Sequence, residues 1–200
     1  MRKLPAKLAS KLYDAAELIA ERGLDGTKID DIAEVTGIPK ATIYYHLDGK
    51  NGVLEFLLND VLDLIAGAVG VAVSGPEDAR TRLEAAVAAQ LGVMLEHPFL
   101  CRALIGDLGR VARLPELALS VNATFFEPIE QLLGEGVADG SLRQVDDPST
   151  VAMSVFGAVT IAGLSVAVEQ PHGDPAANAA RLATAISGLI LDGLAPPGQR

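Results

Sequence analysis

The stretch from Thr27 to Lys50, TKIDDIAEVTGIPKATIYYHLDGK, constrains the fold most, because it predicts two short helices joined by a tight turn. Thr27 is an N-cap residue type, acidic residues follow it in the first helical turn, and Gly37 supplies the stop. Pro39 then fits the first turn of a second helix, where its missing N–H costs little. This second helix has Ile43 as its lone aliphatic residue, so most of its surface is predicted to lie outside the core.

Two helices joined by a three- or four-residue turn form a helix-turn-helix, whose second helix lies in the major groove of DNA. The predicted turn here is Thr36-Gly37-Ile38. An ordinary helical hairpin that ends in Gly and restarts at Pro produces part of this pattern and binds nothing. Spacing, polarity and the N-terminal position together favour the DNA-binding interpretation.

The residues around this turn resemble the DNA-binding domain of the tetracycline-repressor (TetR) family of bacterial regulators. The family pattern is matched by Thr27, Ile32-Ala33, Gly37-Ile38, Thr42, Tyr44 and Lys50. The chain departs from it at four positions, where the usual capping Ser, the usual Phe and the usual two acidic residues are replaced by Pro39, Leu47, Asn51 and Gly52. Gly52 weakens the first turn of the following helix by about 1 kcal/mol relative to a good helix former.

The resemblance implies that Thr27, Tyr44 and Lys50 touch the DNA backbone, while residues 40–42 and Tyr45 face base edges. The predicted DNA-binding residues are Thr27, Lys28, Lys40, Ala41, Thr42, Tyr44, Tyr45, His46 and Lys50.

The charge of the chain is unevenly distributed. Residues 1–50 carry eight basic and eight acidic side chains, whereas residues 51–200 carry eight Arg, no Lys and 18 acids, which accounts for the net charge of −10. Phosphate attraction is screened beyond about 8 Å at physiological salt, so the neutral N-terminal segment matters more for DNA than the total. An acidic body would repel DNA from the wrong face.

Apolar positions recur at intervals of three and four along the whole chain, which predicts an all-α fold. Prolines and Asp N-caps mark several helix starts. The expected helices cover about residues 6–22, 27–36, 39–46, 50–73, 77–95, 98–109, 115–138, 148–169 and 175–192, followed by a frayed tail. Nine helices is also the number that the resemblance implies. We expect a helix-turn-helix domain at residues 1–49 and a larger ligand-binding and dimerisation domain at residues 50–200.

Small and aliphatic residues form neighbouring ridges on the eighth expected helix, and the ninth has an apolar face. Pairing both helices with their symmetry mates would give a four-helix interface between two copies. The alternative is that both helices only cap the core of a monomer. The predicted interface residues are Val151, Ser154, Val155, Ala158, Ala162, Ser165, Leu182, Ile186, Leu189 and Ile190.

An effector site is expected in the larger domain, as the resemblance implies. Pro128 falls inside the seventh expected helix, where it removes the bond to the Thr124 carbonyl and should kink the helix. Aromatic and Met side chains on segments expected to converge there predict an apolar ligand pocket, although core packing explains each one singly. The predicted lining residues are Met94, Phe99, Leu104, Asn122, Phe125, Phe126, Met153, Phe156 and Thr160.

Other functional classes find little support. His97 and Cys101 have metal-ligand spacing, but two ligands do not make a site and Pro98 disturbs the helix between them. Arg102, Arg110 and Arg113 suggest either a carboxylate-binding cluster or, more simply, a solvated face. No catalytic triad order or phosphate-binding Gly loop is present, so we expect no enzyme, metal or cofactor.

Residues 151–168 form an uncharged run of 18 residues, but only nine are large apolar residues and no basic anchor flanks them. We therefore expect a helix that is buried on two sides in a soluble assembly, and the single cysteine favours the reducing cytoplasm.

The sequence thus predicts a homodimeric regulator that binds double-stranded operator DNA and responds to an unidentified small-molecule effector, most simply as a repressor. The alternative is a constitutive DNA-binding co-regulatory module whose large domain only dimerises or binds a protein partner. An enclosed apolar cavity in the larger domain would distinguish the two.

Overall fold

The structure is a computed structural model that describes residues 5–106, 109, 115–169 and 174–194 of the chain. Its regular elements in these ranges are helices, which confirms the all-α prediction. By backbone contacts the chain divides into two compact units, residues 1–61 with 97–117 and residues 62–96 with 118–200. The expected boundary at residue 50 separates DNA binding from ligand binding and dimerisation. A division by contacts does not test that assignment of functions, which stays a prediction.

The first unit contains the N-terminal helices and the start of a long one. Its elements are α1 (Ala6–Leu12), α2 (Asp14–Gly26), α3 (Ile29–Thr36), α4 (Lys40–His46), the first half of α5 (Gly49–Val73) and α7 (Pro98–Gly106). The expected first helix forms as two helices that meet at Tyr13, whose backbone angles are helical, and the geometry breaks at Gly23, directly after the expected end, where φ is +67°. Glycine adopts that conformation without a steric penalty, so the chain can turn toward α3.

The apolar sequence of the long helix α5 is explained by the burial of one of its faces. Seven of its side chains are at most 2 % exposed, as their spacing predicts, and they are Val53, Leu54, Leu57, Leu58, Val61, Leu62 and Ile65. Residues up to Val61 belong to the first unit and the rest to the second, so α5 supplies core side chains to both.

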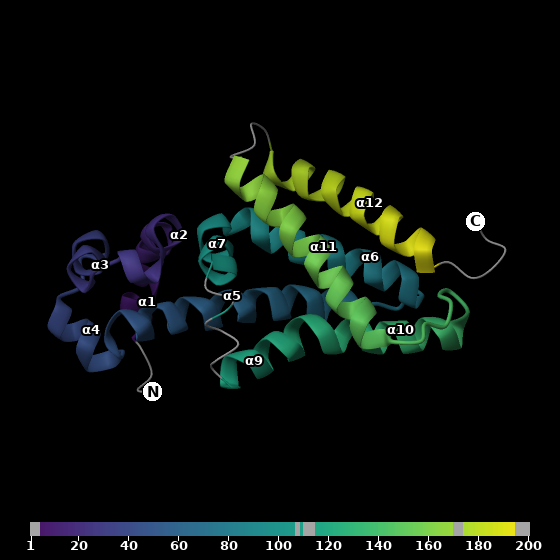
Figure 1. Ribbon diagram of the computed structural model, residues 1–200, viewed down its shortest axis with the longest axis horizontal. Coiled ribbons are helices and arrows are strands. Elements are labelled where there is room, and N and C mark those ends of the chain that lie inside the picture. Colours follow the sequence, from purple (N-terminus) through teal and green to yellow (C-terminus); the bar gives the residue numbers. More distant parts are fainter. Residues whose placement is uncertain (1–4, 107–108, 110–114, 170–173, 195–200) are drawn as a thin grey trace. The chain divides into compact units, whose positions relative to one another are not determined.

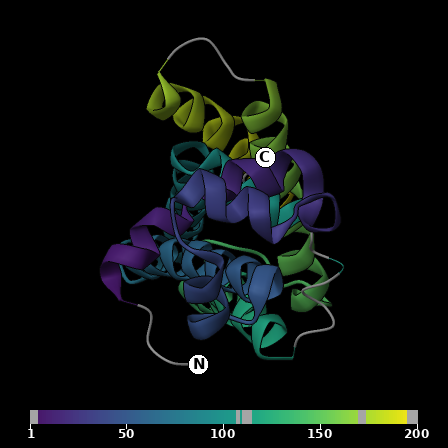
Figure 2. The same cartoon turned by 90° about the vertical axis from the view of Figure 1, so that its left-hand side faces the viewer.

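The second unit is a helical bundle. It contains α6 (Ala79–Glu96), most of α9 (Pro115–Val121), a π-helical segment η1 (Asn122–Phe126), α10 (Glu127–Asp139), α11 (Pro148–Glu169) and α12 (Pro175–Leu194). Helix α6 packs against α10, α11 and α12, as Figures 1 and 2 show. The starts expected at residues 115, 148 and 175 are all observed.

Aspartates cap two of these helices, Asp147 as its position before Pro148 predicts and Asp78 at the start of α6, which was not predicted. The Asp147 carboxylate accepts the Ser149 and Thr150 N–H groups at 3.1 Å each and the Thr150 hydroxyl at 2.6 Å. These bonds hold the pKa of Asp147 below its usual value. At the start of α6 Asp78 accepts the N–H of Thr81 at 2.8 Å. Each cap satisfies donors that the first helical turn leaves unpaired.

Before Pro128 the helix changes its winding, while the expected kink itself stays a prediction. Residues Asn122–Phe126, which end two residues before Pro128, wind as a π-helix, and the Glu127 N–H bonds the carbonyl of Asn122, five residues back. This wider turn places Pro128 at the beginning of α10, where a missing N–H is tolerated. The helix expected over residues 115–138 is therefore three consecutive pieces.

Two helices in the described ranges, Gly49–Val73 and Pro148–Val166, are long and apolar enough by length and composition to cross a membrane. Core helices of soluble proteins have the same properties. In α5 eight large apolar side chains between Val53 and Val69 lie in the protein core, whereas Leu64 and Val71 are exposed.

Candidate functional site

The α3–α4 hairpin is held by a small buried core and a left-handed glycine. Ile32 and Ile43 are 0 % and 2 % exposed, and Gly37 ends α3 with φ at +62°. The Thr36 hydroxyl donates to the Ile32 carbonyl at 2.7 Å and accepts the N–H of Ile38 at 3.2 Å. These contacts fix the direction of α4 relative to α3, as the sequence predicts for a helix-turn-helix.

The outer face of α4 presents several predicted DNA-contacting residues to solvent, both base readers and Tyr44, for which a backbone contact is predicted. Tyr44 and Tyr45 are 61 % and 64 % exposed, and Lys40 and Ala41 are exposed as well. Exposed aromatic side chains add nothing to the protein core, and two adjacent ones on one helix face are typical of a binding surface. Thr42 and His46 are half-buried at its margins.

Tyr44 lies over the start of α5. A Cβ atom at Gly49 would stand 3.1 Å from Cε1 of Tyr44, and Gly49 has φ at +57°. Glycine is therefore needed there both for its backbone conformation and for the close approach of the ring. The approach places Tyr44 beside the α5 N-terminus, whose free N–H groups favour anions such as phosphate.

Thr27 has a different local role from the one expected. Its side chain is fully buried, and its hydroxyl donates to the Gly23 carbonyl at 2.8 Å. The cap position of α3 is Lys28, whose N–H donates to the Asp31 carboxylate at 3.0 Å. The N-cap prediction for Thr27 is thus wrong by one residue, because α3 begins at Ile29 and Thr27 instead closes the end of α2, where its hydroxyl bonds the Gly23 carbonyl. Its contact with DNA stays a prediction.

Lys50 is engaged with the protein backbone. Its ammonium donates to the Leu24 carbonyl at 2.8 Å and to the Thr27 carbonyl at 3.1 Å, at the end of α2. A cation at a helix C-terminus is favourable because the last carbonyls there are unpaired. Lys50 therefore ties α5 to the segment that leads into α3, a role that the motif alone did not reveal.

Two further cations of this region pair with acids of α3. Lys40 on α4 forms an ion pair with Asp30, and Arg22 lies 3.8 Å from Asp31. The hydrogen bond with Asp30 raises the pKa of Lys40. Lys28 is exposed beside them. The structure thus brings the predicted DNA-binding residues into one module.

The predicted effector-site residues do not all belong to one unit. Phe99 and Leu104 lie on α7 in the first unit, where Leu104 is buried, and the other seven lie in the second. Met153 is 52 % exposed on α11, so it does not line a closed pocket within its own unit.

An aromatic cluster does form in the second unit. The ring centroid of Phe156 lies 4.7 Å from that of Phe125 and 5.4 Å from that of Phe126. Both partners belong to η1, and π-helical turns occur frequently at functional sites. Asn122, at the start of the same segment, donates to Glu127 at 2.6 Å.

Buried polar groups accompany the cluster's helices. The Gln90 amide on α6 donates to the Thr160 hydroxyl on α11 at 3.4 Å, and both residues are under 10 % exposed. Met94 on α6 occupies the space that a side chain at Gly163 would take, with Cε 2.6 Å from the position of the missing Cβ. Gln90 and Gly163 were not predicted, because only the packing of α6 on α11 gives them significance.

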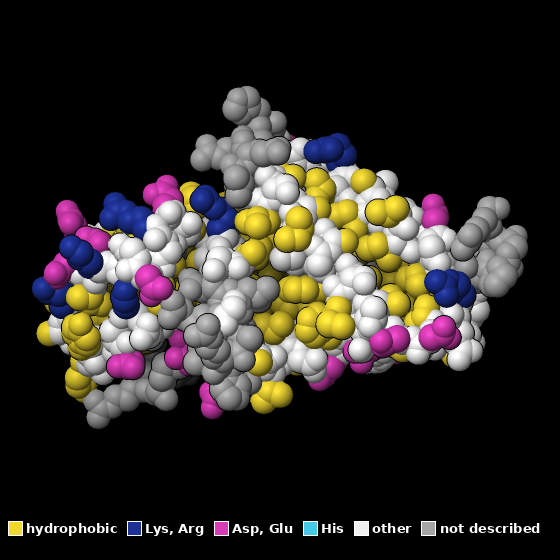
Figure 3. Space-filling view, viewed as in Figure 1, with side chains coloured by type: hydrophobic (Ala, Val, Ile, Leu, Met, Phe, Trp, Pro, Cys, Tyr) yellow, Lys and Arg dark blue, Asp and Glu magenta, His cyan; other side chains and the backbone are white. Residues whose placement is uncertain are grey.

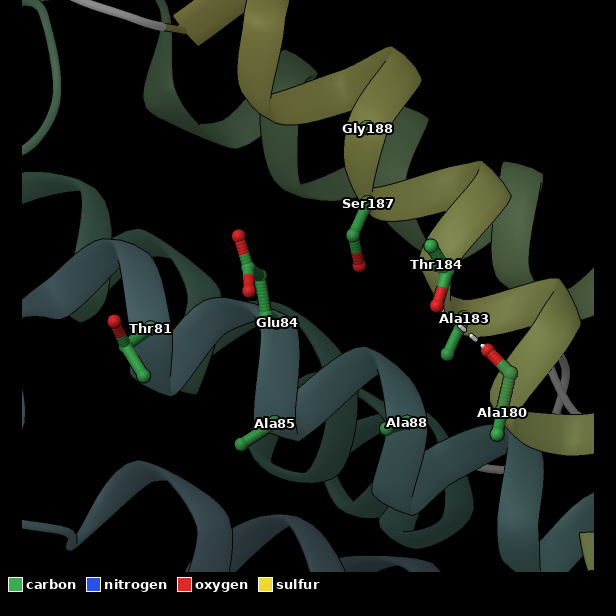
Figure 4. A pocket seen from close by; sticks show the side chains of 9 residues that line it. All are labelled: Thr81, Glu84, Ala85, Ala88, Ala180, Ala183, Thr184, Ser187 and Gly188. Carbon is green, nitrogen blue, oxygen red and sulfur yellow. Dashed lines mark hydrogen bonds between the residues drawn. The ribbon is translucent and has the colours of Figure 1, made fainter.

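An open groove of about 550 Å³ lies between α6 and α12 (Figure 4). Small side chains line it, including Ala85, Ala88 and Ala183, with Glu84 from α6. A hollow of about 230 Å³ in the first unit lies between the end of α2 and α7. Arg102 contributes to it and stacks over Phe99 at 5.9 Å, whereas Arg110 and Arg113 of the suggested cluster lie outside the described residues.

Figure 3 shows hydrophobic side chains gathered over α11 and the helices beside it. Ile161 on α11 is 59 % exposed and Leu189 on α12 is 80 % exposed. Most predicted interface residues are half-buried or exposed, namely Val151, Ser154, Ala158, Ala162, Ser165, Leu182, Ile186, Leu189 and Ile190. Val155 is 3 % exposed, because the aliphatic ridge of α11 faces the core of its own unit.

The described residues contain no group of three or more His, Cys, Asp or Glu side chains that could hold a metal. Cys101 is buried, and this burial raises its pKa to about 12. A thiol with that pKa is not ionised near neutral pH and is a poor metal ligand or nucleophile.

Comparisons with known proteins agree with this architecture. The family model for bacterial regulatory proteins of the tetR family matches residues 12–57. The HTH-type transcriptional repressor KstR2 of Rhodococcus jostii is 30 % identical over 190 residues, which cover 92 % of this chain and 88 % of that protein. A negative regulator of a biofilm operon, IcaR of Staphylococcus aureus, is 45 % identical over 49 residues, 24 % of this chain and 26 % of that one.

Solved structures show the same fold along the whole chain. The ketosteroid regulator KstR2 of Mycobacterium tuberculosis has a TM-score of 0.79 at 21 % identity and covers 97 % of both chains. FadR of Bacillus subtilis, solved in complex with stearoyl-CoA, has a TM-score of 0.72 at 18 % identity and covers 92 % of this chain and 98 % of that one.

Proposed function

The chain belongs to the TetR family of bacterial regulatory proteins, and from this premise we propose that it is a repressor released from operator DNA by a small, largely apolar molecule. The exposed tyrosines of α4 on a buried helix-turn-helix core are the observation that carries the DNA-binding part. In this proposal α4 enters the major groove, where Lys40, Ala41, Thr42 and Tyr45 meet base edges.

The effector part rests on the second unit. Two members of the cluster, Phe125 and Phe126, lie in the π-helical segment and contact Phe156, and the buried Gln90–Thr160 pair supplies polar groups on the same bundle. Apolar walls with a few fixed polar groups are typical of sites for small molecules. The relatives' descriptions, which name ketosteroid regulation and stearoyl-CoA, support an effector that is largely apolar.

In this proposal the protein binds its operator as a dimer. An isolated helix-turn-helix reads one half-site, and a two-fold dimer reads two half-sites about 34–36 Å apart. The exposed apolar residues of α11 and α12 support these helices as the interface, since a monomer would leave them in water. We place the dimer in the cytoplasm, as its relatives are bacterial transcriptional regulators, and assign it no catalytic role.

The operator part of the proposal is tested by selecting duplexes from a randomised DNA pool with the purified full-length protein. We expect enrichment of a two-fold symmetric sequence with half-sites about one helical turn or a multiple of it apart. Recovery of unenriched random sequence would reject sequence-specific binding.

Release is tested on the selected duplex with stearoyl-CoA, a ketosteroid and any small molecule found by native mass spectrometry in the purified protein. Release by one of them supports the repressor mechanism. A protein that carries no small molecule and stays bound in the presence of stearoyl-CoA and of the ketosteroid fits the constitutive co-regulatory module instead.

Enlarging the aromatic cluster tests the location of the effector site. We predict that Phe126→Trp and Phe156→Trp each leave affinity for the selected duplex unchanged but raise the effector concentration needed for release, because the indole occupies ligand volume. Release titrations on both variants and wild type measure this. Superimposable release curves would mean that these phenylalanines are ordinary core residues.

A further inference from the structure

The Asp30–Lys40 ion pair joins the two helices of the DNA-binding hairpin. Asp30 lies in the first turn of α3, and Lys40 is the first residue of α4. Both side chains are more than half exposed, so neither is held by packing. Lys40 is the only Lys or Arg in Lys40–His46. The pair therefore engages the single fixed positive charge of the proposed recognition helix.

The surroundings of this pair are acidic. Helix α3 contains Asp30, Asp31 and Glu34 and no basic residue, so the hairpin from residue 29 to residue 46 has a net charge of −2. Asp31 is already occupied, since it lies 3.8 Å from Arg22 and accepts the N–H of Lys28. A DNA phosphate that approaches Lys40 therefore competes with the Asp30 carboxylate for the ammonium and comes close to a second anion.

We propose that Asp30 is a specificity-determining residue, which withholds Lys40 from arbitrary phosphates and releases or aims it only at an operator base. This inference rests on the proposed function, because it assumes that α4 meets base edges. On random DNA Lys40 would exchange one anionic partner for another, with little gain. An operator guanine offers two acceptors, O6 and N7, without bringing a second anion against Asp30.

Asp30→Asn is the direct test, with Glu34→Gln as its matched control. Both substitutions remove one negative charge from α3, but Glu34 forms no ion pair with Lys40. The measurements are dissociation constants, over a range of salt concentrations, for the duplex that wild type selects and for random-sequence duplex.

We expect Asp30→Asn to bind random DNA more tightly and to steepen its salt dependence by about 0.9, the value for one additional phosphate contact. Its operator preference over random DNA should fall roughly two- to fivefold, the range of one exposed ion pair. Asp30→Glu should behave like wild type, because it restores the carboxylate.

The Lys40→Gln background separates pairing from any effect of Asp30 on α3 itself. If Asp30 acts through Lys40, Asp30→Asn should add to Lys40→Gln no more than Glu34→Gln adds. Equal effects of Asp30→Asn and Glu34→Gln in the wild-type background would overturn the inference as a general charge effect. Failure of wild type to select any sequence would instead count against the proposed function.

Discussion

At the scale of single residues, Lys50 already forms hydrogen bonds within the protein. A contact between Lys50 and DNA would therefore be made in addition to these bonds. Its ammonium bonds two carbonyls at the end of α2, 23 and 26 residues earlier in the chain. A cation in this position holds α2, the start of α3 and the start of α5 together. Loss of Lys50 would therefore disturb the recognition helix even if no phosphate contact existed.

We predict that Lys50→Met lowers the free energy of unfolding by about 1 kcal/mol, because two charge-assisted but partly solvated hydrogen bonds are lost. Denaturant unfolding measures this effect. If Lys50 also touches a phosphate, the salt dependence of random DNA binding should become shallower by about 0.9. Reduced stability with an unchanged salt slope would assign Lys50 to the fold alone.

Tyr13 makes the second informative contact. At the junction of α1 and α2 its hydroxyl donates to the Asp60 carboxylate of α5 at 2.6 Å, and its ring packs against Phe56 at 6.4 Å. Burial and then this hydrogen bond raise its pKa from 10.0 to about 12. The stabilisation that belongs to this shift is complete below pH 10 and is lost as the pH rises through 12.

We predict that the tyrosinate absorbance titration of wild type contains a component near pH 12 that Tyr13→Phe removes. Asp60→Asn should move that component toward lower pH, since the hydrogen bond to the carboxylate contributes to the shift. A titration of Tyr13→Phe with the same high-pH component would contradict the assignment.

At the scale of elements, the packing around α10 shows how closely adjoining segments fit. Leu142 folds back onto α10, donates its N–H to the Gly136 carbonyl at 2.9 Å and is 3 % exposed. A Cβ at Gly136 would stand 2.5 Å from Cδ1 and 2.8 Å from Cβ of Leu142. The conflict includes the base of the Leu142 side chain, so rotation of that side chain alone does not relieve it.

We predict that Gly136→Ala destabilises the protein by about 1–3 kcal/mol, as overpacking of a fitted core does. Gly134→Ala in the same helix is the control, because a Cβ there meets nothing within 4 Å. The control should raise stability by about 0.4–1 kcal/mol through reduced freedom of the unfolded chain. Thermal unfolding of both variants compares them, and shifts of the same sign would contradict the packing argument.

The π-helical segment Asn122–Phe126 is the second informative feature among the helices. Pro128 predicts that the α-helical hydrogen-bond pattern is interrupted. The structure contains a five-residue π-helical segment just before it, and this segment includes Phe125 and Phe126. A π-turn changes the direction of the side chains that follow it relative to an α-helix. The aromatic cluster with Phe156 therefore depends on how this proline is accommodated.

At the scale of the whole molecule, the apolar exposure of α11 and α12 concerns assembly. We predict that Ala158→Arg splits the dimer, since a charge placed unpaired in an interface costs several kcal/mol. Sedimentation should show monomers with unchanged helix content and weaker binding to a two-half-site duplex. Ala138→Arg on the exposed face of α10 is the control and should leave the dimer intact. An intact Ala158→Arg dimer would place the interface elsewhere.

The sequence by itself determined the features that depend on short stretches of chain. Helix starts at proline, the Asp147 cap, the stop at Gly37 and the spacing of buried residues in α5 follow from backbone geometry and periodicity within a few turns. The helix-turn-helix is local in the same sense, because Ile32, Gly37 and Ile43 suffice to set its core and its turn.

Only the tertiary structure decided which distant groups become partners. Lys50 finds carbonyls at the end of α2, Met94 fills the space beside Gly163, and Val155 faces its own core rather than another copy. No local pattern encodes these choices, because each depends on how two helices pack. The sequence therefore predicts the position of α4, whereas the residues that restrain it and those that could surround an effector emerge only from packing.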